Sequence, residues 1–276
     1  MLRKTSLLLL LSTLPIMSAF SAEQNANDSF GAKELNRELV MASLWVEVSG
    51  EYKALAYQAF NLAKVSLEQF KDQNPSIDKF AVVVDVDETV LNNVNYEAWL
   101  IKEGVLHSSA RQKMWADEAI APAIPGSVEF LNFAASLGAE VFYVTNRRED
   151  TRAGTLENLK KEGFPFTDDQ HLLMKSETSN KQIRRDLISA NYHIALLIGD
   201  NLRDFSDDFN TETLAETEVI VNANKSKFGT QFILLPNPQY GDWEGKIYQG
   251  NWRLSPGEKS ELRHKNLRPW QPSELK

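Results

Sequence analysis

The chain of 276 residues contains no cysteine and only four histidines. The absence of cysteine excludes a disulfide framework, a thiolate zinc site and a cysteine nucleophile. It also excludes a lipid-modified cysteine as a membrane anchor. No metal-ligand spacing relates the histidines, so a histidine-based metal centre is not indicated; they are His107, His171, His193 and His264.

Hydrophobic runs long enough to span a bilayer are also lacking, and the longest apolar stretch lies at the N-terminus. Arg3 and Lys4 precede an apolar segment from Leu7 to Leu14, and small residues follow as far as Ala22. This order is typical of a secretory signal peptide, with a buried N-terminal helix as the alternative. We therefore predict a signal peptide over residues 1–22 and a periplasmic or secreted mature chain without a membrane anchor.

Basic residues are in deficit, since 30 Lys and Arg stand against 38 Asp and Glu, for a formal net charge of −8. Loss of Arg3 and Lys4 with the signal peptide makes the mature chain still more acidic. A nucleic-acid polymer binds to a basic surface. The composition therefore argues against a nucleic-acid polymer as partner.

Several short apolar runs lack the alternation of a half-exposed strand, which is typical of strands buried on both faces. The clear runs are 80–85, 141–144 and 194–198, and weaker ones are 172–174, 219–221 and 232–235. Helical patterns over 32–74 (divided in two at Gly50), from Pro125 onward, over 155–161 and over 181–190 lie around them. The alternation predicts an α/β fold with a Rossmann-like parallel sheet flanked by helices and preceded by N-terminal helices.

Residues 92–122 interrupt this alternation and are rich in aromatic residues, including Tyr96, Trp99 and Trp115. A long connection after a strand often carries function. We predict that it forms a small cap inserted in a single domain that spans residues 23–276.

Carboxylates follow two of the predicted strands. Asp85 and Asp87 come directly after the first strand, and Asp200 and Asp204 follow the run at 194–198. The carboxyl ends of parallel strands meet at one crevice, so these side chains are expected to converge there. Clustered carboxylates need a cation, and a set of oxygen ligands without histidine or cysteine favours Mg²⁺ over zinc. Each motif alone is also compatible with a turn or a helix cap.

Lys181 is expected in the first turn of a helix, where a cation opposes the helix dipole at a cost of about 0.3–1 kcal/mol. Sequences tend to break such local rules at functional sites. An exposed surface lysine is the alternative. Together with the carboxylates, its position favours a role beside a bound anion.

Four segments resemble the motifs of the haloacid dehalogenase (HAD) superfamily, and specifically the class C (four-aspartate) bacterial acid phosphatases, which include lipoprotein nucleotidases. These segments are Asp85 to Thr89, Thr145 to Arg147, Lys181, and Gly199 to Asp204, and a later similarity covers Tyr240 to Gly245. The resemblance extends over roughly residues 35–255. It implies a HAD-like fold and an acid phosphatase (phosphomonoesterase) that needs Mg²⁺.

The resemblance also implies roles for single residues. Asp85 would attack phosphorus to form an aspartyl-phosphate, and Asp87 would serve as general acid and base. Thr145 would bind a phosphoryl oxygen, and Lys181 would balance its charge. Asp85, the Asp87 backbone carbonyl and Asp200 would bind Mg²⁺ with support from Asp204, while Asn146, Tyr240 and Trp115 would contact the substrate.

Two departures from the family limit what is carried over. The lipoprotein members have a cysteine after the signal peptide, which this chain lacks. Nucleotidase members enclose the base between aromatic residues, and here Gln112 stands where a cap tryptophan is expected. Phosphomonoesters are therefore the expected substrates, with nucleoside 5′-monophosphates (5′-nucleotidase activity) and a homodimer left open. The alternative function is a catalytically weak nucleotide-binding or storage protein on the same fold.

Overall fold

The computed structural model describes residues 30–271. The predicted signal peptide over residues 1–22 therefore lies outside the described residues. The strands are β1 (Phe80–Val84), β2 (Glu140–Arg148), β3 (Leu172–Lys175), β4 (His193–Gly199) and β5 (Phe232–Leu234). The α-helices are α2 (Ala32–Arg37), α3 (Val40–Val48), α4 (Gly50–Gln73), α5 (Val94–Glu103), α6 (Ser109–Glu118), α7 (Ser127–Ser136), α8 (Arg152–Glu162), α9 (Gln182–Ser189), α10 (Leu214–Ala223), α11 (Asp242–Ile247) and α12 (Pro256–Lys265). Short 3₁₀ helices span Glu149–Thr151, Leu202–Asp204 and Asp207–Phe209.

The strands form one parallel sheet in the order β3-β2-β1-β4-β5, with β1 at its centre. All five residues of β1 are buried, because helices cover both faces of the sheet. Phe80, Val82 and Val84 point into the larger hydrophobic core, and Ala81 and Val83 point into a second, smaller one. The unalternating apolar run in the sequence is thus the mark of a central strand, and the predicted α/β fold is confirmed.

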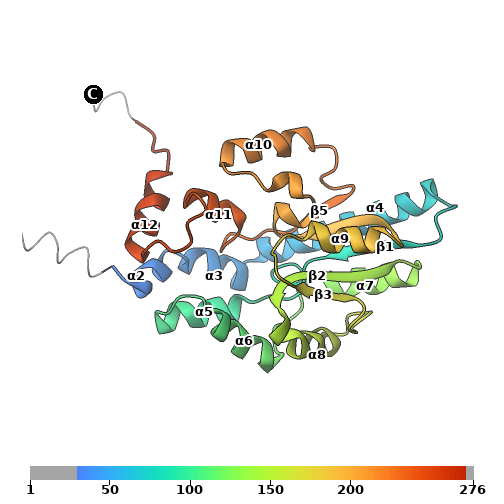
Figure 1. Ribbon diagram of the computed structural model, residues 1–276, viewed down its shortest axis with the longest axis horizontal. Coiled ribbons are helices and arrows are strands. Elements are labelled where there is room, and N and C mark those ends of the chain that lie inside the picture. The colour runs from blue at the N-terminus through green and yellow to red at the C-terminus, as the bar shows by residue number, and fades with distance from the viewer. Residues whose placement is uncertain (1–29, 272–276) are drawn as a thin grey trace, which may run out of the picture.

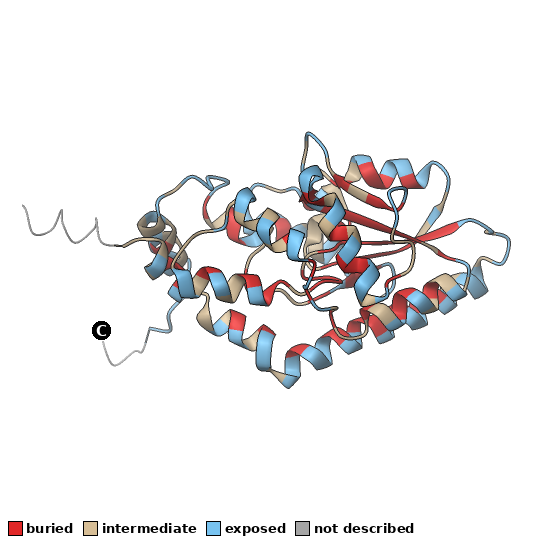
Figure 2. Ribbon diagram, turned by 90° about the horizontal axis from the view of Figure 1, so that it is seen from below, coloured by how far each residue is buried: buried red, intermediate tan, exposed pale blue. Residues whose placement is uncertain are grey.

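The two faces of the sheet carry different helices (Figure 1). The long helix α4, together with α7, packs on the face of the larger core, and α4 runs along the lower edge of the molecule in Figure 2. Helix α9 lies on the other face beside β4, where Ile188 joins the smaller core. Figure 1 shows α2, α3, α5, α11 and α12 gathered at one end of the molecule, although α2 and α3 come from the N-terminal part of the described chain, α11 and α12 from its C-terminal part, and α5 from between them.

Two of the sequence-based element assignments were wrong. Residues 219–221, expected as a weak strand, belong to helix α10. A capping box starts this helix, because the Thr213 hydroxyl accepts from the Glu216 amide and the Glu216 carboxylate accepts from the Thr213 amide. The segment 32–74 contains three helices instead of two, since a break near residue 39 separates α2 from α3.

Two further predicted positions shift by one turn or less. Lys181 is the N-cap residue of α9 and precedes its first turn. Pro125 lies two residues before α7 begins at Ser127, because Gly126 with φ of 88° is the N-cap. Both shifts are of the size by which helix ends commonly differ from expectation.

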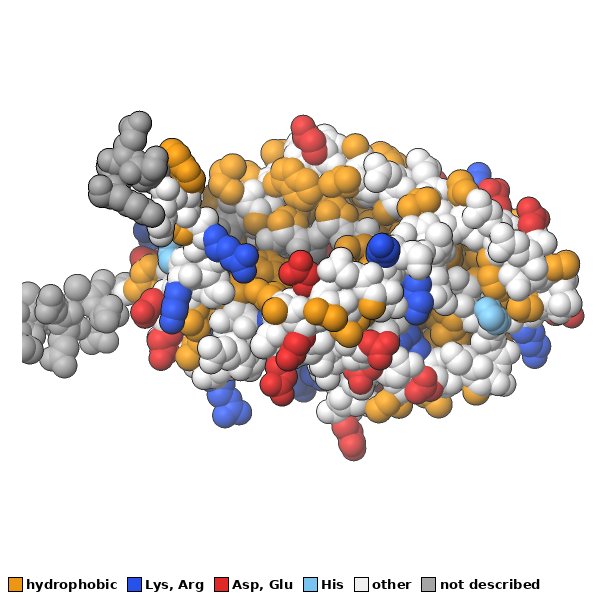
Figure 3. All heavy atoms as spheres, turned by 90° about the horizontal axis from the view of Figure 1, so that it is seen from above, with side chains coloured by type: hydrophobic (Ala, Val, Ile, Leu, Met, Phe, Trp, Pro, Cys, Tyr) orange, Lys and Arg blue, Asp and Glu red, His pale blue; other side chains and the backbone are white. Residues whose placement is uncertain are grey.

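Large hydrophobic side chains also remain on the surface, among them Met41, Val48, Leu187 and Val219. Figure 3 shows such side chains gathered around a hollow on one face of the molecule. Within residues 30–271, no helix combines the length and the apolarity that crossing a membrane requires.

The segment 92–122 contains α5 and α6, and α6 is fixed to the core through Gly154 of α8. A β-carbon at Gly154 would lie 2.2 Å from the Ala116 carbonyl oxygen of α6. Only glycine permits this approach of the two helix backbones. The packing of α6 against α8 thus depends on the absence of a side chain at residue 154.

We expect Gly154→Ala to destabilise the protein by roughly 1–3 kcal/mol, because the new methyl group must push α6 and α8 apart. The measurement is the urea midpoint of unfolding. Gly257→Ala in α12 is the matched control, since the nearest atom to its β-carbon is 3.9 Å away. Equal midpoints for the two variants would contradict the prediction.

Candidate active site

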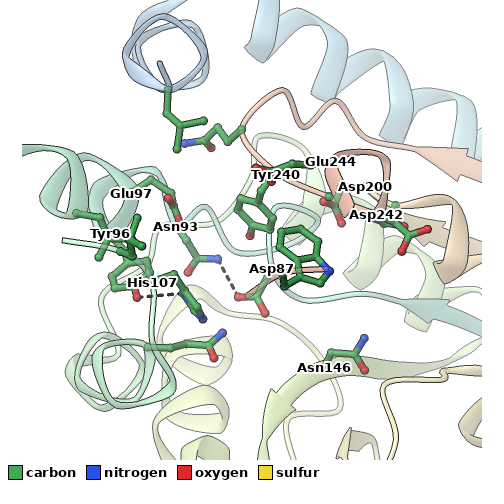
Figure 4. A pocket seen from close by; sticks show the side chains of 18 of the residues that line it. Asp87, Asn93, Tyr96, Glu97, His107, Asn146, Asp200, Tyr240, Asp242 and Glu244 are labelled. Carbon is green, nitrogen blue, oxygen red and sulfur yellow. Dashed lines mark hydrogen bonds between the residues drawn. The ribbon is translucent and has the colours of Figure 1, made fainter. Parts of the chain in front are cut away.

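A cavity of about 700 Å³ opens at the carboxyl ends of the central strands. Its floor is formed by the loops after β1 and β4, and its walls come from α5, α6 and the segment 239–244. Figure 4 shows polar side chains from these elements pointing into one space. This cavity is where the predicted site residues meet, as expected for an open parallel sheet.

Asp85, Asp200 and Asp204 form a carboxylate cluster on the cavity floor. One oxygen from each lies within 4.8 Å of the other two. Asp85 and Asp204 are buried, and Asp200 is partly exposed. Two oxygens bound to one divalent ion lie at most about 4–5 Å apart, twice the metal–oxygen distance. The donor set thus fits a hard divalent cation.

The sheet itself brings the carboxylates together. The Asp85 amide donates to the Ile198 carbonyl at 2.9 Å, so the β1 loop leaves the sheet beside the β4 loop. Gly199, the last residue of β4, allows the Asp204 side chain to fold back over the strand end, because a β-carbon there would lie 2.3 Å from Asp204 Oδ2. That oxygen accepts from the Asn201 amide at 3.0 Å.

Lys181 lies between two of these carboxylates. Its ammonium group donates to Asp85 and, at 2.6 Å, to Asp204 Oδ1, and its side chain is 7% exposed. The lysine at the start of α9 therefore faces the cluster instead of solvent. These two ion pairs explain why a cation stands at the start of a helix, where it opposes the helix dipole.

One lysine does not neutralise the cluster. Burial raises the pKa of Asp85 well above its usual value, with Lys181 lowering it and the charges of Asp204 and Asp200 raising it further. Burial and the charge of Asp204 raise the pKa of Asp200 to about 7. An additional cation would relieve this repulsion, which agrees with the geometry of the donor set.

Asp87 lies outside this cluster and pairs with Arg147. Arg147 Nε donates to Asp87 Oδ1 at 2.9 Å, and the Asn93 amide nitrogen donates to the same oxygen at 2.8 Å. Burial opposes ionisation of Asp87, but the charge and hydrogen bonds of Arg147 outweigh it and lower the pKa of this carboxyl. Its side chain is held by Arg147 and Asn93 and is not part of the three-carboxylate set.

Asn93 connects four groups around Asp87. Its amide nitrogen donates to Asp87 and to Glu88, and its oxygen accepts from Trp115 at 2.7 Å and from Arg147 at 3.2 Å. Figure 4 draws the bond from Asn93 to Asp87 at the edge of the cavity. The N-cap residue of α5 thereby fixes the orientation of the carboxyl group of Asp87.

Two buried arginines of helix α9 hold the C-terminal part of β2 and the loop after β4 in place. Arg184 donates to the Thr145 carbonyl and, at 2.7 Å, to Asn146 Oδ1. Arg185 donates to the Arg203 and Asp204 carbonyls at 3.0 and 2.9 Å. Together with Lys181 they occupy one helix face, at the spacing i, i+3 and i+4.

Thr145 and Asn146 differ in exposure. Thr145 is fully buried, and its hydroxyl accepts from the Arg147 amide at 3.0 Å. Asn146, which follows Thr145 in β2, lines the cavity, and Figure 4 shows it across from Asp87. The assignment of Thr145 to a phosphoryl oxygen stays a prediction.

Aromatic side chains line the cavity walls. Trp115 and Tyr240 are both in the lining, as are Tyr96 and His107. Tyr96 lies parallel to Trp115 at 6.2 Å and hydrogen-bonds His107 Nδ1 at 3.1 Å. His107, for which the sequence indicates no metal site, therefore contributes to the cavity wall.

Sequence reasoning missed Asn93, Arg147, Arg184 and Arg185 as residues of this site. Arg184 and Arg185 could have been found, because with Lys181 they form a cationic face at helical spacing. Nothing local distinguishes Asn93, whose contacts reach 22 and 54 residues along the chain.

Comparison with known proteins extends the similarity over most of the chain. The sequence profile of the HAD superfamily, subfamily IIIB (acid phosphatase), matches residues 12–243. The class C acid phosphatase from Bacillus anthracis superposes with a TM-score of 0.83 at 36% identity, covering 86% of this chain and 99% of that one. Its structure with tungstate bound gives 0.82 at 36% identity, covering 87% and 100%.

Plant proteins are also similar. A stem 31 kDa glycoprotein of Glycine max is 30% identical over 167 residues, which is 57% of this chain and 58% of the plant protein. Acid phosphatase 1 of Solanum lycopersicum is 30% identical over 131 residues, which is 44% and 50%. The chain thus spans about half the length of the curated relatives it matches.

Without a divalent cation, we expect stability to fall as pH rises from 5 to 7.5. The unfolded chain releases the Asp200 proton near pH 3.8, whereas the folded chain holds it to about 7. Because the pKa of Asp200 is higher in the folded chain, its contribution to stability is fully present below the unfolded-state pKa of 3.8. That contribution is lost as the pH rises toward the folded-state pKa of about 7. Melting temperatures in chelator should therefore decrease over this range, and added Mg²⁺ should restore them most at pH 7.5.

Asp200→Asn should flatten this pH dependence, because it removes one titrating group. Asp72→Asn on the exposed face of α4 is the control and should retain the slope. A melting temperature in chelator that stays level from pH 5 to 7.5 in the unsubstituted protein would show that the carboxylates do not repel one another as described.

Proposed function

We propose that this chain, which belongs to the HAD superfamily subfamily IIIB of acid phosphatases, is an exported, Mg²⁺-dependent acid phosphatase that hydrolyses phosphomonoesters through an aspartyl-phosphate at Asp85. The family match and the class C structural neighbours confirm the resemblance seen in the motifs and indicate a phosphomonoesterase. The metal, the intermediate and the export are our proposals.

One observation carries the assignment. Two loops more than a hundred residues apart in the sequence bring Asp85, Asp200 and Asp204 to within 4.8 Å at the cavity floor, with Lys181 between two of them. Buried charges of one sign are costly to assemble. Their convergence is explained if they bind a cation and a phosphoryl group whose charges complement one another.

Asp85 is the nucleophile in the first step. One carboxylate oxygen forms a bond to phosphorus while the bond from phosphorus to the ester oxygen breaks. Asp87 gives its proton to the leaving alkoxide, and Arg147 and Asn93 hold it for that transfer. Lys181 neutralises charge on the phosphoryl oxygens, which is where a phosphoryl transition state carries it.

Asp87 acts as the base in the second step. It takes a proton from a water molecule, whose oxygen attacks phosphorus and releases Asp85 and inorganic phosphate. The covalent intermediate divides one difficult displacement into two easier ones. The residues that would hold Mg²⁺ are Asp85, Asp200 and the Asp87 backbone, with Asp204 beside them. When bound, the ion neutralises negative charge around the phosphoryl group.

The wall aromatics support an organic leaving group next to the phosphate. Tyr240 and Trp115 are in the lining, and Asn146 lies across from Asp87. Phosphomonoesters with a cyclic leaving group, nucleoside 5′-monophosphates included, fit a cavity of about 700 Å³. Export rests on the N-terminal sequence, because basic residues precede an apolar segment and small residues.

Asp85→Asn should reduce hydrolysis of p-nitrophenyl phosphate at least about 10³-fold, because an amide is not a nucleophile for phosphorus. The fold should be retained, since asparagine has the same shape and lessens the repulsion in the cluster. Acid-quenched wild-type enzyme should carry substrate phosphate in a hydroxylamine-sensitive bond that is missing from the variant. Asp72→Asn serves as the control, and turnover retained by Asp85→Asn would refute the nucleophile assignment.

Arg147→Gln should move the alkaline limb of the kcat–pH profile to higher pH. Arg147 lowers the pKa of Asp87, so the protonated acid disappears at low pH in the wild type. Without the guanidinium, burial dominates, the pKa rises, and the acid stays protonated to higher pH. The exposed neighbour provides a control, Arg148→Gln, with the limb expected to stay in place. A limb that moves down, or does not move, would exclude Asp87 as the acid of the first step.

A further inference from the structure

Glu97 lies in the cavity wall one helix turn beyond the residue that holds the general acid. Asn93 is the N-cap of α5, and the Glu97 amide donates to its carbonyl at 3.1 Å. Residues at i and i+4 share a helix face, about 5–6 Å apart. Glu97 therefore faces the space that a leaving group occupies. In Figure 4 it stands beside Asn93, on the side of the cavity toward Tyr240.

The carboxyl group of Glu97 makes no hydrogen bond or ion pair with the residues from 30 to 271, whereas the neighbouring charges are paired. Glu244, whose charge acts on Glu97, accepts from Arg263 and Tyr248 at 2.6 Å each. Asp242 pairs with Lys246 at 3.0 Å. Glu97 thus keeps its hydrogen-bonding capacity for something that enters the cavity.

Gln239 provides a second, independent acceptor in the lining. Its side chain is 1% exposed, and its amide nitrogen donates to Ser43 Oγ at 2.9 Å. Its Oε1 is the buried side-chain polar atom that lacks a partner among the described residues. Buried polar groups are nearly always satisfied, so an unpartnered acceptor in a ligand cavity indicates a donor on the ligand.

We propose that Glu97 and Gln239 form an acceptor subsite that binds hydroxyl groups of the leaving group, so that the preferred substrates are phosphate esters of ribose or similar polyols. This inference rests on the proposed phosphatase function. Hydroxyl groups satisfy both acceptors, whereas an ammonium group would meet the positive charges of Lys259 and Arg263 in the same lining.

The acidity of Glu97 agrees with a neutral ligand. Burial, followed by the charges of Glu244 and Asp87, raises the pKa of Glu97 to about 7. At the acidic pH at which the enzyme is expected to work, the group is a neutral carboxylic acid. Such a group both accepts and donates a hydrogen bond, which matches a hydroxyl better than a cation.

The test compares two substrates of equal ring size, ribose 5-phosphate and cyclopentylmethyl phosphate, which has no hydroxyl groups. The quantity is the ratio of their kcat/KM values. Glu97→Met, which keeps the side-chain size but loses the acceptors, should lower this ratio about tenfold. Glu97→Gln retains an acceptor and should recover most of the wild-type ratio. Glu103→Gln, exposed on the same helix, is the control and should leave the ratio as it is.

Adenosine 5′-monophosphate as a third substrate separates the two sources of ribosyl hydroxyls, which are a sugar phosphate and a nucleotide. It should lose as much from Glu97→Met as ribose 5-phosphate does if the subsite binds hydroxyls, and a loss confined to one substrate would overturn that. A ratio that is unchanged in Glu97→Met, with turnover intact, refutes the subsite alone. A wild-type protein that hydrolyses neither simple ester refutes the phosphatase function and the subsite with it.

Discussion

Repulsion among the carboxylates of Asp85, Asp200 and Asp204 is the constraint around which the site is organised, because burial denies them the water that would screen their charges. Lys181 offsets part of it from the start of α9. Two arginines of the same helix hold the C-terminal part of β2 and the loop after β4 in place. The three carboxylates therefore keep their arrangement although they repel one another. This arrangement suits the binding of a cation together with a phosphoryl group. Sites of this kind give up stability for function.

The free-energy cost of the buried carboxylates is offset by the packing of the strand that precedes Asp85. Strand β1 is buried on both faces, and its alternate residues serve two separate cores. Asp85 follows the last residue of this strand, and its amide continues the pairing with β4. A central strand that is buried along its whole length thus presents the proposed nucleophile. Preorganisation of this kind matters in phosphoryl transfer, where positioning and charge account for most of the catalysis.

The fold and the carboxylates could be predicted from sequence because their signals are local. An apolar run such as 80–84 marks a central strand, and a carboxylate at its end marks the crevice. The segment 219–221 was misjudged because β-branched residues also occur in helices, and the capping box at Thr213 decided the outcome. Asn93, Arg147 and Glu97 escaped notice because their roles depend on contacts between distant segments. Unused hydrogen-bonding capacity, as at Gln239, becomes visible only once the partners of every other polar atom are known.

Asn93 has a consequence for how such an enzyme can diversify. One amide group contacts Asp87 and Arg147, which belong to the proposed proton transfer, and Trp115 of α6 in the cavity wall. A substitution that reshapes the cavity wall around Trp115 for a new leaving group would also disturb the hydrogen bond that orients Asp87. Changes in substrate range and in turnover are thus inherited together. Homologues with an altered cavity wall around Trp115 should also carry changes at the start of α5 that restore the orientation of Asp87.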